Sequence, residues 1–179
     1  DIAQQVSINL QTVITQREKE QIEKVPTQNV EAHAYYVMGR FFWNRRTEDG
    51  VKKSIEYFEK AVQSDPDYAL AWIGLADGYN ILAGYGWYIP KKEGYDKAII
   101  YVQKALKLDK TLAEAHTTFG LILGYQQWKW EEAEKKLKLA LKLNPNYAFA
   151  HQIYAQLLDI TGDYEKARKQ IDLALELDP

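Results

Sequence analysis

Apolar residues recur at every third or fourth position through most of the chain, which is the spacing of amphipathic helices. Short polar turns separate these runs, and Pro66, Pro145 and Pro179 stand where a proline would stop a helix. The pattern predicts an all-α protein with helices near 30–44, 47–64, 67–83, 91–108, 111–125, 129–143, 146–160 and 163–177. We expect more than about 70% helix, against roughly 30–35% in ordinary globular proteins.

The C-terminal half contains two near-copies of one motif, at 113–145 and 148–179. The same residue type returns after 34 positions at Ala133 and Ala167, Ala140 and Ala174, and Pro145 and Pro179. Two earlier copies fit the same slots, so that repeats start at Ala32, Ala69, Ala113 and Ala148. The extra residues of the longer repeats fall between the first and second helix of each repeat.

A period of 34 residues with small residues at fixed slots and a closing proline resembles the tetratricopeptide repeat, or TPR. The resemblance implies a right-handed α-solenoid of four helix pairs, at 29–66, 67–110, 111–145 and 146–179, in which each pair buries its apolar face against its neighbours. The stretches 31–82 and 112–151 also resemble the TPR region of bacterial multidomain regulators. In those proteins the array follows a winged-helix DNA-binding, nucleotidyl cyclase or Ser/Thr kinase domain, none of which is present in this sequence.

Particular slots of the repeat have a physical interpretation. Gly39 and Gly120 are small enough to let two helices approach closely. The slot that holds tryptophan in the TPR pattern is filled by Trp72, but by His116 and His151 in the last two repeats, and we interpret these histidines as packing residues rather than metal ligands. We also expect the residues after the prolines, Asp67 and Asn146, to be N-caps of the following helices.

The first 28 residues do not match the repeat. Ile2, Val6, Leu10 and Val13 recur at helical spacing, which favours a helical segment that caps the open face of the first repeat. The alternative is a linker helix that belongs to an upstream domain. Because the sequence begins with Asp1 rather than methionine, we expect it to be a processed or excised fragment.

Composition excludes several classes of function. The chain has no cysteine, so it has no thiolate nucleophile and no zinc–thiolate site. A formal net charge of −2 gives no broad field for binding nucleic acid or an anionic membrane. No spacing of residues indicates a catalytic centre, and we expect a cytoplasmic protein that is not an enzyme and has no cofactor, no metal and no direct contact with nucleic acid or membrane.

TPR arrays usually bind extended peptides or helices on the concave face, which the first helices of the repeats line. The slots that point inward predict a groove of mainly aromatic, amide and hydroxyl side chains with little net charge. It is formed by Tyr36, Arg40, Trp43, Asn44, Ile73, Asp77, Asn80, Thr117, Thr118, Tyr125, Gln152 and Gln156. The carboxylate clamp of some TPR proteins is absent, because Tyr36, Gly74, Glu114 and Thr118 occupy its places. A ligand with a free C-terminal carboxylate is therefore not expected.

Aromatic residues also gather where the first helix of a repeat turns into the second. This rim contains Tyr85, Trp87, Tyr88, Trp128 and Trp130. One interpretation is a recognition surface, since tryptophan and tyrosine are enriched in binding hot spots. The other is a packed cluster that holds long turns against the stack.

The resulting hypothesis is a non-enzymatic scaffold for protein–protein interaction, which binds a peptide or partner segment on its concave face. The alternative is a sensory domain of a bacterial signalling or transcription regulator, with a ligand site closed by residues 83–94. We also expect self-association through the uncapped C-terminal end, where Ile171 and Leu175 should be exposed.

Overall fold

The computed structural model describes residues 26–84 and 89–178. Within these ranges the chain forms eight α-helices and no strand, and the bounds agree with the expected helices to within three residues. The helices are α3 (Val30–Trp43), α4 (Glu48–Ser64), α5 (Ala69–Gly84), α6 (Lys91–Leu108), α7 (Ala113–Gln127), α8 (Trp130–Leu143), α9 (Ala148–Thr161) and α10 (Tyr164–Leu177).

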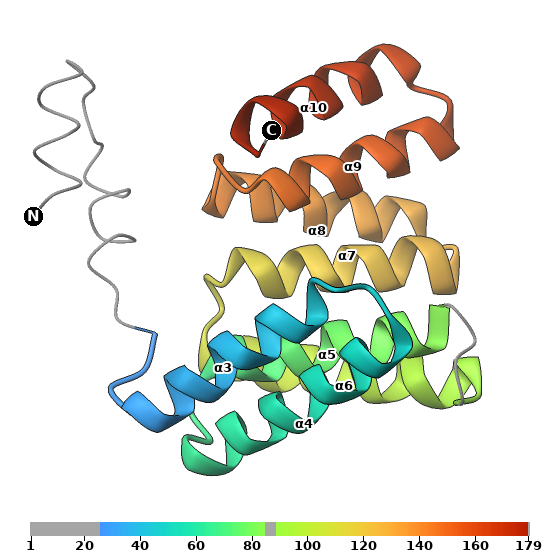
Figure 1. The fold of residues 1–179 in the computed structure, drawn as a ribbon. Coiled ribbons are helices and arrows are strands. Elements are labelled where there is room, and N and C mark those ends of the chain that lie inside the picture. The colour runs from blue at the N-terminus through green and yellow to red at the C-terminus, as the bar shows by residue number, and fades with distance from the viewer. Residues whose placement is uncertain (1–25, 85–88, 179) are drawn as a thin grey trace, which may run out of the picture.

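The helices form four antiparallel pairs stacked in one row, from α3 and α4 at one end to α9 and α10 at the other (Figure 1). Each first helix packs on the first helix of the next pair, as α3 on α5, α5 on α7 and α7 on α9. Among the described residues no second helix packs on the next second helix. The row therefore curves with the first helices on the inside, and the expectation of an α-solenoid is confirmed.

The core between the first two repeats is built around one aromatic ring. Phe58 of α4 is fully buried between Gly39 of α3 and Gly74 of α5. A Cβ atom added at either glycine would lie 2.5 Å from the nearest carbon of the Phe58 ring. The two glycines thus leave the space that the ring fills, which allows the two inner helices to lie close together.

Ring nitrogens at the equivalent slot of three repeats contact a backbone carbonyl in the preceding turn. Nε1 of Trp72 donates to the carbonyl of Pro66 at 2.8 Å, and Nε2 of His151 lies 2.8 Å from the carbonyl of Pro145. Nε2 of His116 lies 3.0 Å from the carbonyl of Lys110, the residue in the proline slot. In each case the carbonyl belongs to the residue six positions earlier. The histidines are buried packing residues, as expected, and each ring ties its helix to the turn before it.

The turns between repeats differ from the expectation. The backbone N–H groups of Asp67 and Asn146 are hydrogen-bonded to the side chains of Asp65 and Asn144, at 3.0 and 3.1 Å. The N-cap of α9 is Tyr147, which makes no side-chain cap bond. The assignment of Asn146 as the N-cap of that helix is therefore wrong. The side chain before the proline stabilises the turn instead, in the manner of an Asx turn.

Both ends of the array present apolar side chains. At the C-terminal end Ile171 and Leu175 of α10 are exposed, as expected. At the other end Val37 and Phe41 of α3 are exposed, whereas their equivalents in the last repeat, Ile153 and Leu157, are buried against the preceding pair. The segment expected to cap this face lies almost wholly outside the described residues, so the cap and the self-association stay predictions.

Replacing Gly74 by alanine should destabilise the protein by roughly 1–3 kcal/mol, although alanine is the better helix former, because the added methyl group overlaps the Phe58 ring. Adding Phe58→Leu should recover part of this loss, because the smaller side chain vacates the space. Denaturant unfolding of the two single variants and the double variant measures the coupling. Strictly additive effects would show that Phe58 is not the group that the methyl meets.

The contribution of His116 to stability should fall as the pH drops from 7 towards 5. Burial lowers the pKa of His116 from its ordinary value of 6.5, so the unfolded chain binds more protons than the folded one in this range. Its Nδ1 atom is buried and has no partner among the described residues, so a proton there would be unsatisfied. His116→Trp, which copies the Trp72 arrangement, should reduce the pH-dependent loss of the melting temperature. An unchanged loss would contradict this role.

Candidate functional site on the inner face

The side chains expected to line the groove fall into two groups by accessibility. Trp43, Ile73, Asp77, Thr117 and Thr118 are buried. Tyr36, Arg40, Asn80 and Tyr125 are half-buried, and Asn44, Gln152 and Gln156 are exposed. The buried group comes from the first three repeats, so the surface that a ligand can reach lies towards the last two repeats and the turn after α3.

A buried ion pair connects the first three inner helices. The guanidinium of Arg40 on α3 lies 3.2 Å from one carboxylate oxygen of Asp77 on α5. The hydroxyl of Thr118 on α7 donates to the other carboxylate oxygen at 2.7 Å. Burial raises the pKa of Asp77, while Arg40 and Thr118 oppose this by favouring the charged form. The charge is thus satisfied by its neighbours, which position α3, α5 and α7 relative to one another.

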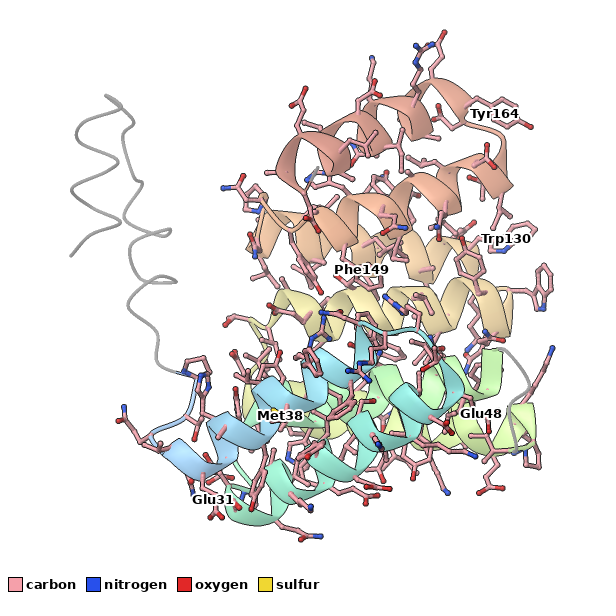
Figure 2. All side chains as sticks on the ribbon, viewed as in Figure 1. Glu31, Met38, Glu48, Trp130, Phe149 and Tyr164 are labelled. Carbon is pink, nitrogen blue, oxygen red and sulfur yellow. The ribbon has the colours of Figure 1, made fainter. Side chains whose placement is uncertain are left out.

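An aromatic contact joins the first repeat to the fourth. The Trp43 ring at the end of α3 meets the Phe149 ring near the start of α9 edge to face, with centroids 6.4 Å apart. Figure 2 labels Phe149 on the side of α9 that faces α3 and α7. The guanidinium groups of Arg40 and Arg46 lie over the Trp43 ring, 4.2 and 3.5 Å from its centroid. The side chains of the array therefore close part of its own inner face.

More titratable groups converge on this closed part. Burial raises the pKa of Tyr36 to about 12, and it also raises the pKa of Tyr147 and of Glu114. The acidic groups Asp77 and Glu114 raise the pKa of Tyr147 further, while Arg40 lowers it. Residues from all four repeats thus act on one another electrostatically here, and a phenol of this kind stays protonated at neutral pH.

Two polar atoms in this region are buried without a hydrogen bond among the described residues. They are Nε1 of Trp43 and Oδ1 of Asn80, which occupy the same slot in the first and second repeats. Leaving a buried donor or acceptor unpaired costs free energy. The closed inner face is therefore not fully satisfied by its own groups.

The accessible part of the inner face carries amide and hydroxyl side chains, with the exposed carboxylate of Asp159 close enough to act electrostatically on Tyr125. The hydroxyl of Tyr125 on α7 donates to the amide oxygen of Gln156 on α9 at 3.0 Å. Gln152 lies one helical turn before Gln156, and Asn44 follows Trp43 at the turn after α3. Burial raises the pKa of Tyr125, so it remains a neutral hydrogen-bond donor. These amides and this hydroxyl can bind the polar backbone of an extended segment.

Two of the five rim residues lie within the described part of the chain. Tyr85, Trp87 and Tyr88 lie outside the described residues. Trp128 is 71% exposed and Trp130 is 41% exposed, and their rings meet edge to face with centroids 6.2 Å apart. The packed-cluster interpretation is therefore wrong for Trp128, whose ring contributes little to any core.

Sequence reasoning missed two residues that shape the inner face. Phe149 and Arg46 are not among the slots that the sequence predicts to point inward. Periodicity places residues on a helix face but does not show that the curvature brings the fourth repeat back to the first. The Arg46 backbone adopts a left-handed φ of 53°. This conformation is uncommon for a residue other than glycine, so the sequence does not predict it.

Other chemistry finds no support in the described parts of the chain. No group of three or more His, Asp or Glu side chains there could hold a metal ion. None of the helices seen there has the length and apolar character to cross a membrane.

Comparison with known proteins identifies the repeats. Two family models described as tetratricopeptide repeat match residues 136–169 and 51–68. The chain contains tetratricopeptide repeats. The comparison with curated proteins found no match to this sequence.

Solved structures, two of them described as TPR, have a similar fold. TTC0263, a thermophilic TPR protein of Thermus thermophilus, is 23% identical with a TM-score of 0.70, over 85% of this chain and 76% of that one. The first TPR of Spaghetti (RPAP3), bound to the HSP90 peptide SRMEEVD, is 17% identical with a TM-score of 0.56, over 78% and 99%. MamA of Desulfovibrio magneticus RS-1 is 19% identical with a TM-score of 0.51, over 84% and 77%.

Removing the cation of the buried ion pair should be costly. Arg40→Met leaves the buried Asp77 carboxylate without its partner, which should destabilise the protein by about 3 kcal/mol. This is the low end of the cost of breaking a buried ion pair, because the Arg40 side chain is one-third exposed. Asp77→Asn in the same protein should restore part of the loss, because the amide carries no charge. Urea unfolding at pH 7 measures both. Equal stability of the single and double variants would refute the pairing.

Proposed function

We propose that this chain is a non-enzymatic protein-interaction module that binds a peptide or a partner segment on its inner face. TPR proteins generally mediate protein–protein interaction, and one solved structure with this fold, the first TPR of Spaghetti, is bound to an HSP90 peptide. The observation that carries the proposal for this chain is the exposed, uncharged strip of Asn44, Gln152 and Gln156 beside Tyr125.

The chemistry of the strip favours the interior of a peptide over its end. Amide and hydroxyl groups can satisfy backbone N–H and C=O groups of an extended segment, which gives affinity without a need for opposite charge. The places of the carboxylate clamp hold Tyr36, Gly74, Glu114 and Thr118, none of which is a cation and one of which is acidic. A free C-terminal carboxylate would therefore meet no clamp.

The two unpaired atoms next to the strip support the same site. The Trp43 indole N–H can only donate and the Asn80 amide oxygen can only accept, and a bound segment that reaches them would supply the missing partners. A peptide unit offers one group of each kind. Binding would then satisfy groups that the free protein leaves unpaired.

The experiment is selection of a phage-displayed random-peptide library on the protein, followed by calorimetric titration of the selected peptide. Gln152→Glu with Gln156→Glu should weaken binding by about tenfold or more, because two central contacts acquire charge. The matched control is Gln63→Glu with Gln103→Glu, which makes the same change at exposed positions on the second helices α4 and α6. Equal weakening by both pairs, or by neither, would overturn the assignment to the inner face.

A further inference from the structure

The turn after α7 places a tryptophan in a backbone conformation that suits glycine. Trp128 is the C-cap of α7, with a left-handed φ of 57°. The equivalent C-cap of α9, 34 positions later, is Gly162 with a φ of 89°. A side chain is strained in this conformation, and the Trp128 ring is 71% exposed, so burial does little to offset the strain. The fold therefore gains little from this ring.

Two further rings continue the exposed surface. Trp130 at the start of α8 meets Trp128 edge to face and is 41% exposed. Tyr164 at the start of α10 is 67% exposed. Figure 2 shows Trp130 and Tyr164 on the same edge of the array, where α8 and α10 begin. We call Trp128, Trp130 and Tyr164 the aromatic edge.

The tryptophans of the aromatic edge differ from the other two that the structure describes, each of which has a cation over its ring. The guanidinium of Arg46 lies 3.5 Å from the centroid of the Trp43 ring, and Nζ of Lys104 lies 5.7 Å from that of Trp72. Within the described ranges no cation lies over either tryptophan of the edge. Since the face of an indole attracts a cation, these rings can accept one from another molecule.

The side chains around the aromatic edge carry an excess of acidic charge. Segments 128–132 and 159–166 contain five acidic residues and two lysines, which are Glu131, Glu132, Asp159, Asp163 and Glu165 against Lys129 and Lys166. One of each is used within the fold, because Lys166 forms an ion pair with Asp163. Further basic residues of α8 and α10 begin at Lys135 and Arg168, at least one turn along each helix. The remaining four carboxylates against one lysine favour a positively charged partner.

One of these carboxylates has no role in the fold. Asp159 is exposed in the last turn of α9, where the negative end of the helix dipole disfavours a carboxylate. It forms no ion pair with any residue that the structure describes. Glu131 and Glu165 differ, because they stand in the first turns of α8 and α10, where an acidic side chain stabilises a helix. A cation from a partner would give Asp159 the counter-charge that the fold does not supply.

The combination of rings and carboxylates favours arginine over lysine as that cation. A guanidinium is planar, so it can stack on an indole while its N–H groups point sideways to carboxylates. An ammonium has no flat face and is more strongly hydrated. Arg46 over Trp43 is an example of the stacked arrangement in the first repeat. We propose that the aromatic edge binds an arginine-containing segment of a partner protein, with guanidinium groups on the indole rings and beside the carboxylates.

The probe is a Gly-Arg decapeptide with blocked ends, titrated into the ¹⁵N-labelled full chain while the indole N–H signals are followed by NMR. Replacing each tryptophan by phenylalanine assigns the five signals. We expect saturable shifts of the Trp128 and Trp130 signals with this peptide and none with a Gly-Glu decapeptide. A Gly-Lys decapeptide should bind about threefold more weakly or worse. The signals of Trp43 and Trp72 should not move, which separates this surface from the inner face.

Two sets of substitutions test the rings and the charges separately. Trp128→Gly should weaken binding of the arginine peptide by about threefold or more without lowering the melting temperature, because glycine suits this backbone. Glu131→Gln with Glu165→Gln should weaken it by about threefold as well, because two carboxylates of the edge are removed. The matched control is Asp49→Asn with Glu56→Gln, which removes two exposed carboxylates from α4 in the first repeat and should leave binding unchanged.

Several results would overturn the proposal. One is the lack of any saturable shift at a millimolar concentration of the arginine peptide, or an equal shift with the glutamate peptide. Another is equally tight binding of the lysine peptide, or equal weakening by the control pair, either of which would reduce the effect to net charge alone. A third is that decaproline or maltoheptaose, and not the arginine peptide, moves the two signals. A melting temperature more than about 4 °C lower in Trp128→Gly would show instead that the ring stabilises the fold. None of these results bears on peptide binding at the inner face.

Discussion

How closely two neighbouring inner helices can lie depends on how little side chain stands between them. Gly39 and Gly74 leave only enough space for the Phe58 ring, which comes from the outer helix of the first pair. The inner helices then pack on one another while the outer ones do not, and the row of helix pairs must bend towards its inner side. The remaining features of the inner face follow from that bend.

Because the row bends, side chains from separate inner helices contact one another and form one connected cluster. Arg40, Asp77 and Thr118 connect three repeats through a satisfied buried charge. Trp43 and Phe149 add the fourth through an aromatic contact. The part of the inner face that stays open is the uncharged strip next to this cluster. Affinity for a segment there would be drawn from hydrogen bonds and from the unpaired groups at the edge of the cluster, rather than from ion pairs.

The helix pairs and their order could be predicted from the sequence, because the same local features return with a 34-residue period. Each repeat has a small residue where two helices approach closely, a ring side chain at the slot of Trp72, and a residue that ends its second helix. The groove could be predicted only as a set of inward slots. Which of those slots stays open depends on the curvature, a property of the whole array that no single repeat contains. Thr118 shows the difference, since its slot was expected to face a ligand and it hydrogen-bonds Asp77 instead. The strained turn at Trp128 was also not predictable, because the pattern gives no reason for a ring in a glycine conformation.

The contact of Trp43 with Phe149 also limits how this gene could change in length. The two rings meet because two complete units separate the repeats that carry them. Duplicating or deleting one unit between them would place a different residue opposite Trp43 and leave its ring exposed to water. The contact therefore ties the inner face to an array with two units between the repeats that carry the rings.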